Sequence, residues 1–77
     1  MAKSAARQAH DEARVRAAEW YAVIDEDADL DYLLNTALPQ AKEVTEDAKR
    51  SPDDRLMAAM TLELIAAGIT KRVAYEL

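Results

Sequence analysis

The sequence predicts a small all-α protein, and three observations lead to that prediction. Alanine occurs 17 times among the 77 residues, whereas glycine occurs only at Gly68 and proline only at Pro39 and Pro52. Alanine has the highest intrinsic helix propensity, and the residues that favour strands are sparse in this chain. Apolar residues also recur at steps of three and four, which is the spacing of one helix face. We therefore expect a single all-helical domain over residues 1–77.

The first helix is expected over residues 2–24, where apolar residues occupy positions 2, 6, 9, 13, 17, 20 and 24. Ser4 is a candidate N-cap, because a serine hydroxyl accepts hydrogen bonds from the free amides of the first turn. The apolar face is almost pure alanine as far as Val15 and becomes bulky only from Trp20 and Tyr21 onward. An alanine face buries little area, so the first three turns should be weakly held unless something packs on them.

One or two short helices are expected around Pro39. Their apolar stripe consists of Leu30, Leu33, Leu34 and Leu38. Asp27 or Asp29 is the candidate N-cap, since a short carboxylate accepts hydrogen bonds from the first free amides. Pro39 disfavours a helical conformation at Leu38, so the helix should end or kink there. A helix can then restart with Pro39 in its first turn, where no amide donor is needed.

The last helix is expected over residues 52–75. Ser51 is its N-cap, Pro52 takes the first helical position, and Asp53 and Asp54 follow, where the helix dipole favours negative charge. We expect this helix to pack antiparallel to the first one, with the short helices covering one end of the pair.

This last helix carries two apolar stripes. At 100° per residue, one stripe consists of Met57, Met60, Leu64 and Tyr75. The other consists of Leu62, Ile65, Ile69 and Val73. A helix that is apolar on most sides is usually buried on most sides, and one chain of this size has few large apolar side chains to cover both stripes. We therefore expect a homodimer.

The dimer interface is expected to lie on the second stripe. Its residues are Leu62, Ile65, Gly68, Ile69 and Val73. Gly68 costs about 1 kcal/mol relative to alanine inside a helix, which suggests a close helix approach or a locally loosened helix. A charged residue in place of Ile65 or Ile69 is expected to give a folded or partly folded monomer.

The stretch "DEDADLDY", residues 25–32, holds five carboxylates. They belong to Asp25, Glu26, Asp27, Asp29 and Asp31. A calcium loop with this alternation needs glycine at its sixth position and glutamate at its twelfth. Counted from Asp25, these positions hold Leu30 and Thr36, so the stretch does not form that loop. We interpret it as a helix exit and a capped helix entry that a partner protein contacts, together with Trp20 and Tyr21.

Negative charge is concentrated in the middle of the chain. Residues 25–48 sum to −7, whereas residues 1–24 sum to +1, residues 49–55 to +1 and residues 56–77 to zero, which gives −5 in total. A nucleic-acid surface needs clustered Lys and Arg, and the basic residues here alternate with acids. Direct nucleic-acid binding is therefore not expected.

The sequence lacks the usual elements of catalytic and metal sites. His10 stands alone, and neither Ser4 nor Ser51 has a base nearby in sequence. Three carboxylates, those of Glu43, Glu46 and Asp47, have the spacing that acidic helices use to hold magnesium, but no second such cluster completes a site. We expect no enzymatic activity and no cofactor. Glu63 interrupts the apolar run of the last helix, and we expect it to be exposed rather than buried against Arg14 or Arg16.

A cytoplasmic location is expected. The chain has no cysteine and no charged-then-apolar leader. Its longest nearly apolar run, residues 56–69, is shorter than the ~20 residues that span a bilayer, so no membrane contact is expected.

Three functional hypotheses remain. The first is a non-enzymatic regulator or adaptor that binds another protein and acts as a homodimer. The second is an acidic inhibitor that mimics a nucleic acid and blocks a basic site on a partner enzyme, as anti-defence proteins of mobile elements do. The third is a metal-dependent helical enzyme or sensor that uses the clustered carboxylates.

Overall fold

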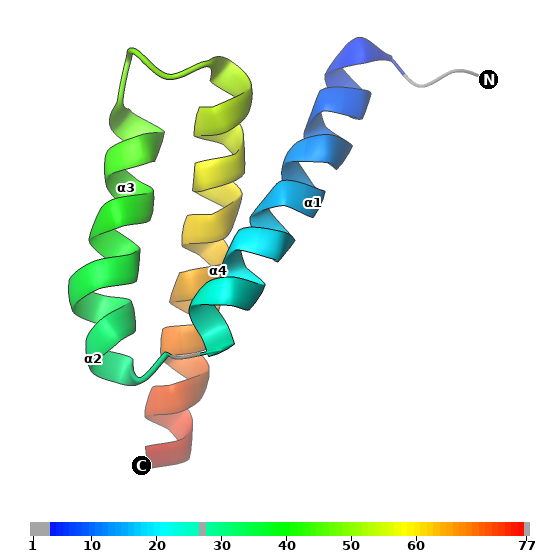
Figure 1. Cartoon of the computed structure of the whole chain (residues 1–77). Helices are drawn as coiled ribbons and strands as arrows, with labels where there is room; N and C mark the ends of the chain where they lie inside the picture. The colour runs from blue at the N-terminus through cyan, green and yellow to red at the C-terminus, as the bar shows by residue number, and fades with distance from the viewer. Residues whose placement is uncertain (1–3, 27, 77) are drawn as a thin grey trace.

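The computed structural model describes residues 4–26 and 28–76 of the chain, with the side chain of Glu76 left out. Of these residues 89% are helical and none belongs to a strand, so the all-α prediction is confirmed. The elements are α1 (Ala5–Glu26), α2 (Leu30–Tyr32), η1 (Leu33–Ala37), α3 (Leu38–Glu46) and α4 (Pro52–Glu76). They form three helical arms, because α2, η1 and α3 follow one another without a break (Figure 1).

The first arm is α1, and it begins where the sequence predicts a cap. The backbone N–H of Arg7 donates to Ser4 Oγ at 3.2 Å, which satisfies one of the free amides of the first turn. The helix continues to Glu26, two residues beyond the predicted end. Ala2 and Lys3, which were predicted to be helical, lie outside the described residues.

The middle arm, Leu30–Glu46, is capped by Asp29. Its side chain accepts a hydrogen bond of 2.7 Å from the backbone N–H of Tyr32. The alternative N-cap, Asp27, lies outside the described residues.

The middle arm passes Pro39 without ending. The segment η1 is a π-helix, in which the N–H of Leu38 donates to the carbonyl of Leu33 five residues earlier. Proline has no N–H, and in a regular α-helix its ring collides with the carbonyl four residues before it, here that of Asn35. The wider π turn accommodates the proline, which lies in the first turn of α3 as predicted. The sequence therefore predicted where the helix would be irregular. The helix does not end there, however, but continues through a π-helical turn.

The third arm, α4, is defined at its start by the predicted residues. The N–H of Asp54 donates to Ser51 Oγ at 3.1 Å, Pro52 is the first helical residue, and Asp53 and Asp54 lie in the first turn. Arg55 ties this turn to the end of the middle arm, because its Nε donates to the carbonyl of Thr45 at 3.0 Å.

The two long helices pack together as predicted, but they run parallel and not antiparallel (Figure 1). Arg16, in the middle of α1, bonds to Asp54 near the start of α4, and Asp25, near the end of α1, bonds to Arg72 near the end of α4. The prediction treated the middle segment as a cover for one end. That segment is instead a continuous arm of about 25 Å at 1.5 Å per residue, so it returns the chain to the starting end before α4 begins.

The molecule is thin and elongated because α4 lies between the other two arms. It packs against α1 on one side and against α3 on the other, while α1 diverges from α3 toward its N-terminus (Figure 1). The molecule measures 47 × 30 × 17 Å, and its radius of gyration of 13.7 Å exceeds the roughly 11.5 Å of a compact domain of 77 residues. Among the described residues, no helix combines the length and the hydropathy that a membrane span needs.

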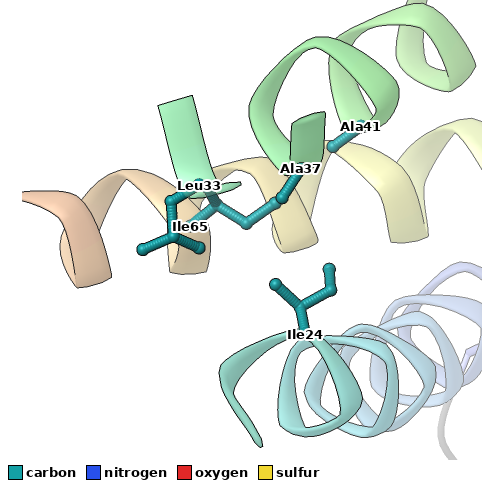
Figure 2. Close-up of a cluster of buried hydrophobic side chains, with 5 residues drawn as sticks. All are labelled: Ile24, Leu33, Ala37, Ala41 and Ile65. Atoms are coloured by element: carbon teal, nitrogen blue, oxygen red, sulfur yellow. The ribbon is translucent and has the colours of Figure 1, made fainter. Parts of the chain in front are cut away.

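The buried cluster lies where all three arms converge. It contains Ile24 from α1, Leu33, Ala37 and Ala41 from the middle arm, and Ile65 from α4 (Figure 2). Toward the N-terminal ends of α1 and α4, the buried residues beyond this cluster have small side chains: Ala13, Ala17, Ala58 and Thr61. The helices can therefore approach closely there, although they bury little area per residue.

Most of the stripe predicted to form the dimer interface lies in the interior of the chain itself. Ile65 is fully buried, Gly68 is buried, and Leu62 and Ile69 pack against the central cluster. Val73 is the one exposed member, at 38%. The stripe is covered within the chain by both outer arms, because Ile65 lies in the cluster where the three arms meet and Gly68 lies under Tyr21 of α1. A charged residue in place of Ile65 would therefore disrupt the core of the chain and would not report on association.

The core position can be tested by comparing Ile65→Ala with Val73→Ala. We expect Ile65→Ala to lower the free energy of unfolding by about 3 kcal/mol, because it removes a buried side chain and leaves a cavity. Val73→Ala should cost less than about 1 kcal/mol, since the side chain is partly solvated. Urea denaturation followed by circular dichroism measures both values, and equal losses would contradict the placement of Ile65.

Candidate functional site

Two groups of side chains occupy the contact between α1 and α4. One is a polar cluster near the C-terminal ends of both helices, formed by Tyr21, Asp25, Gly68 and Arg72. The other is a groove farther toward the N-terminal ends. Its lining residues are His10, Arg14, Ala17, Ala18, Met60, Glu63 and Leu64.

Arg72 is the centre of the polar cluster. Its Nη2 donates to Asp25 Oδ1 at 2.7 Å and its Nη1 donates to the carbonyl of Gly68 at 3.2 Å. The hydroxyl of Tyr21 donates to the same Asp25 oxygen at 3.3 Å. One carboxylate of α1 is therefore held by a guanidinium of α4 and by a phenol one turn earlier.

These contacts shift the titration of both charged groups. The hydrogen bond from Arg72 lowers the pKa of Asp25 below its usual 3.8, and the same bond raises the pKa of Arg72. A second ion pair joins the same helices farther up, where Arg16 Nη2 bonds to Asp54 Oδ1 at 2.8 Å and lowers the pKa of Asp54. Two ion pairs thus fix the register of α1 on α4.

Gly68 lies directly under the hydroxyl of Tyr21. A Cβ atom at this position would collide with Tyr21 Oη and would lie 3.1 Å from Arg72 Nη1. The sequence predicted a close approach or a loosened helix at Gly68. The structure shows the close approach, and it is made by a side chain of the same molecule.

The acidic stretch predicted to contact a partner is largely engaged within the chain. Asp25 bonds to Arg72, Asp29 caps the middle arm, and Asp31 accepts a hydrogen bond of 2.6 Å from Asn35. Glu26 is exposed, and Asp27 lies outside the described residues.

The two aromatic residues predicted to join this contact are also used internally. Trp20 and Tyr21 are partly buried and pack against the central cluster. Of the six predicted contact residues that the structure describes, the four carboxylates are exposed and the two aromatic residues are partly buried.

The carboxylates considered for magnesium are not gathered into a metal site. Asp47 follows the end of α3, where its Oδ1 accepts from the backbone N–H of Lys49 at 3.0 Å and its Oδ2 lies 3.7 Å from Arg50 Nε. Within the described residues, no group of three or more His, Cys, Asp or Glu side chains could hold a metal ion.

The groove lies between the N-terminal half of α1 and the middle of α4, and it encloses about 400 Å³. Its apolar lining includes Ala17, buried to 1% exposure, and Ala18 from α1, together with Met60 and Leu64 from α4. Leu64 is 37% exposed, although it belongs to an apolar stripe of α4. The large side chains of α4 and the alanines of α1 leave a space between them that no other side chain of the described residues fills.

Opposite charges stand on the two walls of this groove. His10 and Arg14 belong to α1 and Glu63 belongs to α4; all three are exposed, which confirms the expectation for Glu63. Within the described part of the chain, none of the three makes a hydrogen bond or an ion pair. An exposed imidazole, guanidinium and carboxylate around an apolar lining can bind a surface of complementary charge and shape.

The sequence contained the parts of this groove without indicating their arrangement. The Met60 and Leu64 stripe and the alanine face of the first helix were both recognised. Which residues of α1 lie beside Met60 and Leu64 depends on how the two helices pack, and the apolar pattern alone does not specify this.

The contact between Gly68 and Tyr21 can be tested with a double-mutant cycle. Gly68→Ala normally stabilises a helix by about 1 kcal/mol. Here the new methyl group displaces the Tyr21 hydroxyl from Asp25, so the gain should be lost. In a Tyr21→Phe background the hydroxyl is absent and only the flexible end of Arg72 lies close, so the effect of Gly68→Ala on the free energy of unfolding should be more favourable by about 1 kcal/mol or more. Additive effects of the two substitutions would contradict the contact.

The ion pair of Asp25 predicts a pH dependence of stability. Because the pKa of Asp25 is lowered in the folded state, its stabilising effect is complete well above 3.8, the ordinary value, and is lost as the pH falls through the lower folded value. Asp25→Asn should therefore lower stability at neutral pH and flatten the acid limb of the stability curve. Glu26→Gln is the matched control and should leave both unchanged. Urea midpoints measured from neutral pH to below 3.8 test this, and parallel curves for wild type and Asp25→Asn would contradict it.

The groove, the polar cluster and the Arg16–Asp54 ion pair each combine opposite charges from α1 and α4. Comparison with protein-family models, with curated proteins and with solved structures finds no match for this chain.

Proposed function

We propose that this protein is a non-enzymatic interaction module that binds another protein through the groove between α1 and α4. The observation that carries the proposal is the groove itself, which has an apolar lining and two walls with opposite charges that have no partner within the described residues. Apolar contact supplies the driving force for association, and charges at the rim set orientation and specificity.

The surface area of the molecule supports an interaction role. The chain exposes 5611 Å², whereas a compact monomer of 8.5 kDa exposes about 4,700 Å². The excess of about 900 Å² arises because three arms lie side by side in a thin molecule. An interface of standard size covers about 800 Å² per partner, so binding one protein would bring the exposed area to the usual range.

The groove suits a protein partner better than a small molecule. Small-molecule sites enclose most of the ligand surface. The charged residues here are exposed, and the groove follows two adjacent helices. Such a surface fits a helix or a pair of helices that lay apolar residues between the walls.

A second candidate function uses the middle arm. Its outer carboxylates, which include Asp31, Glu43 and Glu46, are exposed and lie in the segment that carries most of the negative charge. An acidic inhibitor would present this arm to a basic site on its partner. The arm and the groove lie on opposite sides of α4, so substitutions can separate the two proposals.

Affinity capture with three variants distinguishes the candidates. Leu64→Glu places a charge in the groove and should abolish capture of a partner, because the charge would be desolvated in the complex. Val15→Glu, at a position on α1 that is 57% exposed and outside the groove, is the matched control and should retain it. Loss of the partner with Glu43→Lys/Glu46→Lys but not with Leu64→Glu would favour the acidic inhibitor. Retention by all three variants would reject both surfaces.

A further inference from the structure

We propose that the occupant of the groove is the same groove of a second copy, so that the protein forms a two-fold symmetric homodimer through α1 and α4. This inference rests on the proposed function and names its partner. It differs from the interface that the sequence predicted, because the stripe with Ile65 lies inside the chain.

The distribution of charge within the groove favours a second copy. Arg14 stands on the α1 wall and Glu63 on the α4 wall of the same groove, and neither has a partner in the described chain. A two-fold axis that runs parallel to the groove, between the two copies, places α1 of each copy over α4 of the other. Arg14 of one copy then faces Glu63 of the other, and the same pair forms twice. One surface thus supplies both members of each ion pair, as an isologous interface requires.

The shape of the groove is suited to this contact. Leu64 and Met60 project from α4, while Ala17 and Ala18 line the α1 wall. Under the two-fold axis the large side chains of one copy meet the small ones of the other. The contact would stack the two α1–α4 pairs face to face as a four-helix bundle. It would also cover part of the excess surface of each copy.

The test uses Arg14→Glu and Glu63→Arg, separately and mixed, in analytical ultracentrifugation. The wild type should be dimeric at about 100 μM, and each variant alone should weaken the dimer by at least about tenfold, because each places like charges opposite one another twice. When the two variants are mixed, both opposite-charge pairs are restored, so a heterodimer should form. The Arg14→Glu/Glu63→Arg double variant should likewise dimerise.

Matched controls come from α3, which packs on the side of α4 away from the groove. Lys42→Glu and Glu46→Arg make the same charge changes at exposed positions of α3, and both should leave the dimer unchanged. Circular dichroism confirms that each variant is folded. Because Arg14 and Glu63 are exposed and make no hydrogen bond or ion pair within the described chain, folding should not depend on their charges.

Several outcomes would overturn the inference. A wild type that is monomeric at about 100 μM excludes the homodimer. A dimer that ignores both charge reversals, or folded variants that do not associate on mixing, excludes this surface as its interface. If the wild type is monomeric and yet captures a different protein in a manner that Leu64→Glu abolishes, the interaction function stands and only the second copy is rejected. If no binding of any kind depends on Leu64, the proposed function fails as well.

Discussion

The packing of α4 against α1 on one side and against the middle arm on the other is the contact on which the whole structure depends. The two outer arms have little contact with each other beyond the convergence at the central cluster. α4 can serve both because it is apolar on two sides, and Ile65 lies where these sides meet. Loss of α4 would leave two helices with no common core.

The composition of the chain explains why this packing leaves a groove. Alanines form much of the interior, and the largest fully buried side chains are Leu33, Ile65 and Thr61. Small side chains allow α1 and α4 to approach closely at Ala13 and Ala17, but they do not fill the space beside this contact, toward Met60 and Leu64. The groove is thus a direct result of an alanine-rich first helix whose bulky residues are concentrated at its C-terminal end.

Local signals in the sequence were sufficient to predict the helices and their starts. Ser4, Asp29 and Ser51 cap as expected, because a cap depends only on residues within one turn. The predicted direction of α1 relative to α4 was wrong, because this direction depends on whether the middle arm stops or continues at Pro39. A π turn of five residues decides that, and a single sequence carries no clear signal for it. The candidate groove could not be predicted either, because it depends on how closely the alanine face of α1 packs beside Met60 and Leu64, and no local signal specifies that packing.

The order of the arms along the chain also bears on how the protein folds. The contact of Arg55 with Thr45 joins residues 10 apart, whereas the bonds from Arg16 to Asp54 and from Arg72 to Asp25 close loops of 38 and 47 residues. Closing a short loop costs less chain entropy than closing a long one. We therefore expect the hairpin of α3 and α4 to form before the contacts with α1. We expect α1 to dock after this hairpin and to be the first element to detach from the native state. α1, which forms one wall of the groove, is therefore the element that should open most easily. A partner bound in the groove would slow this local unfolding.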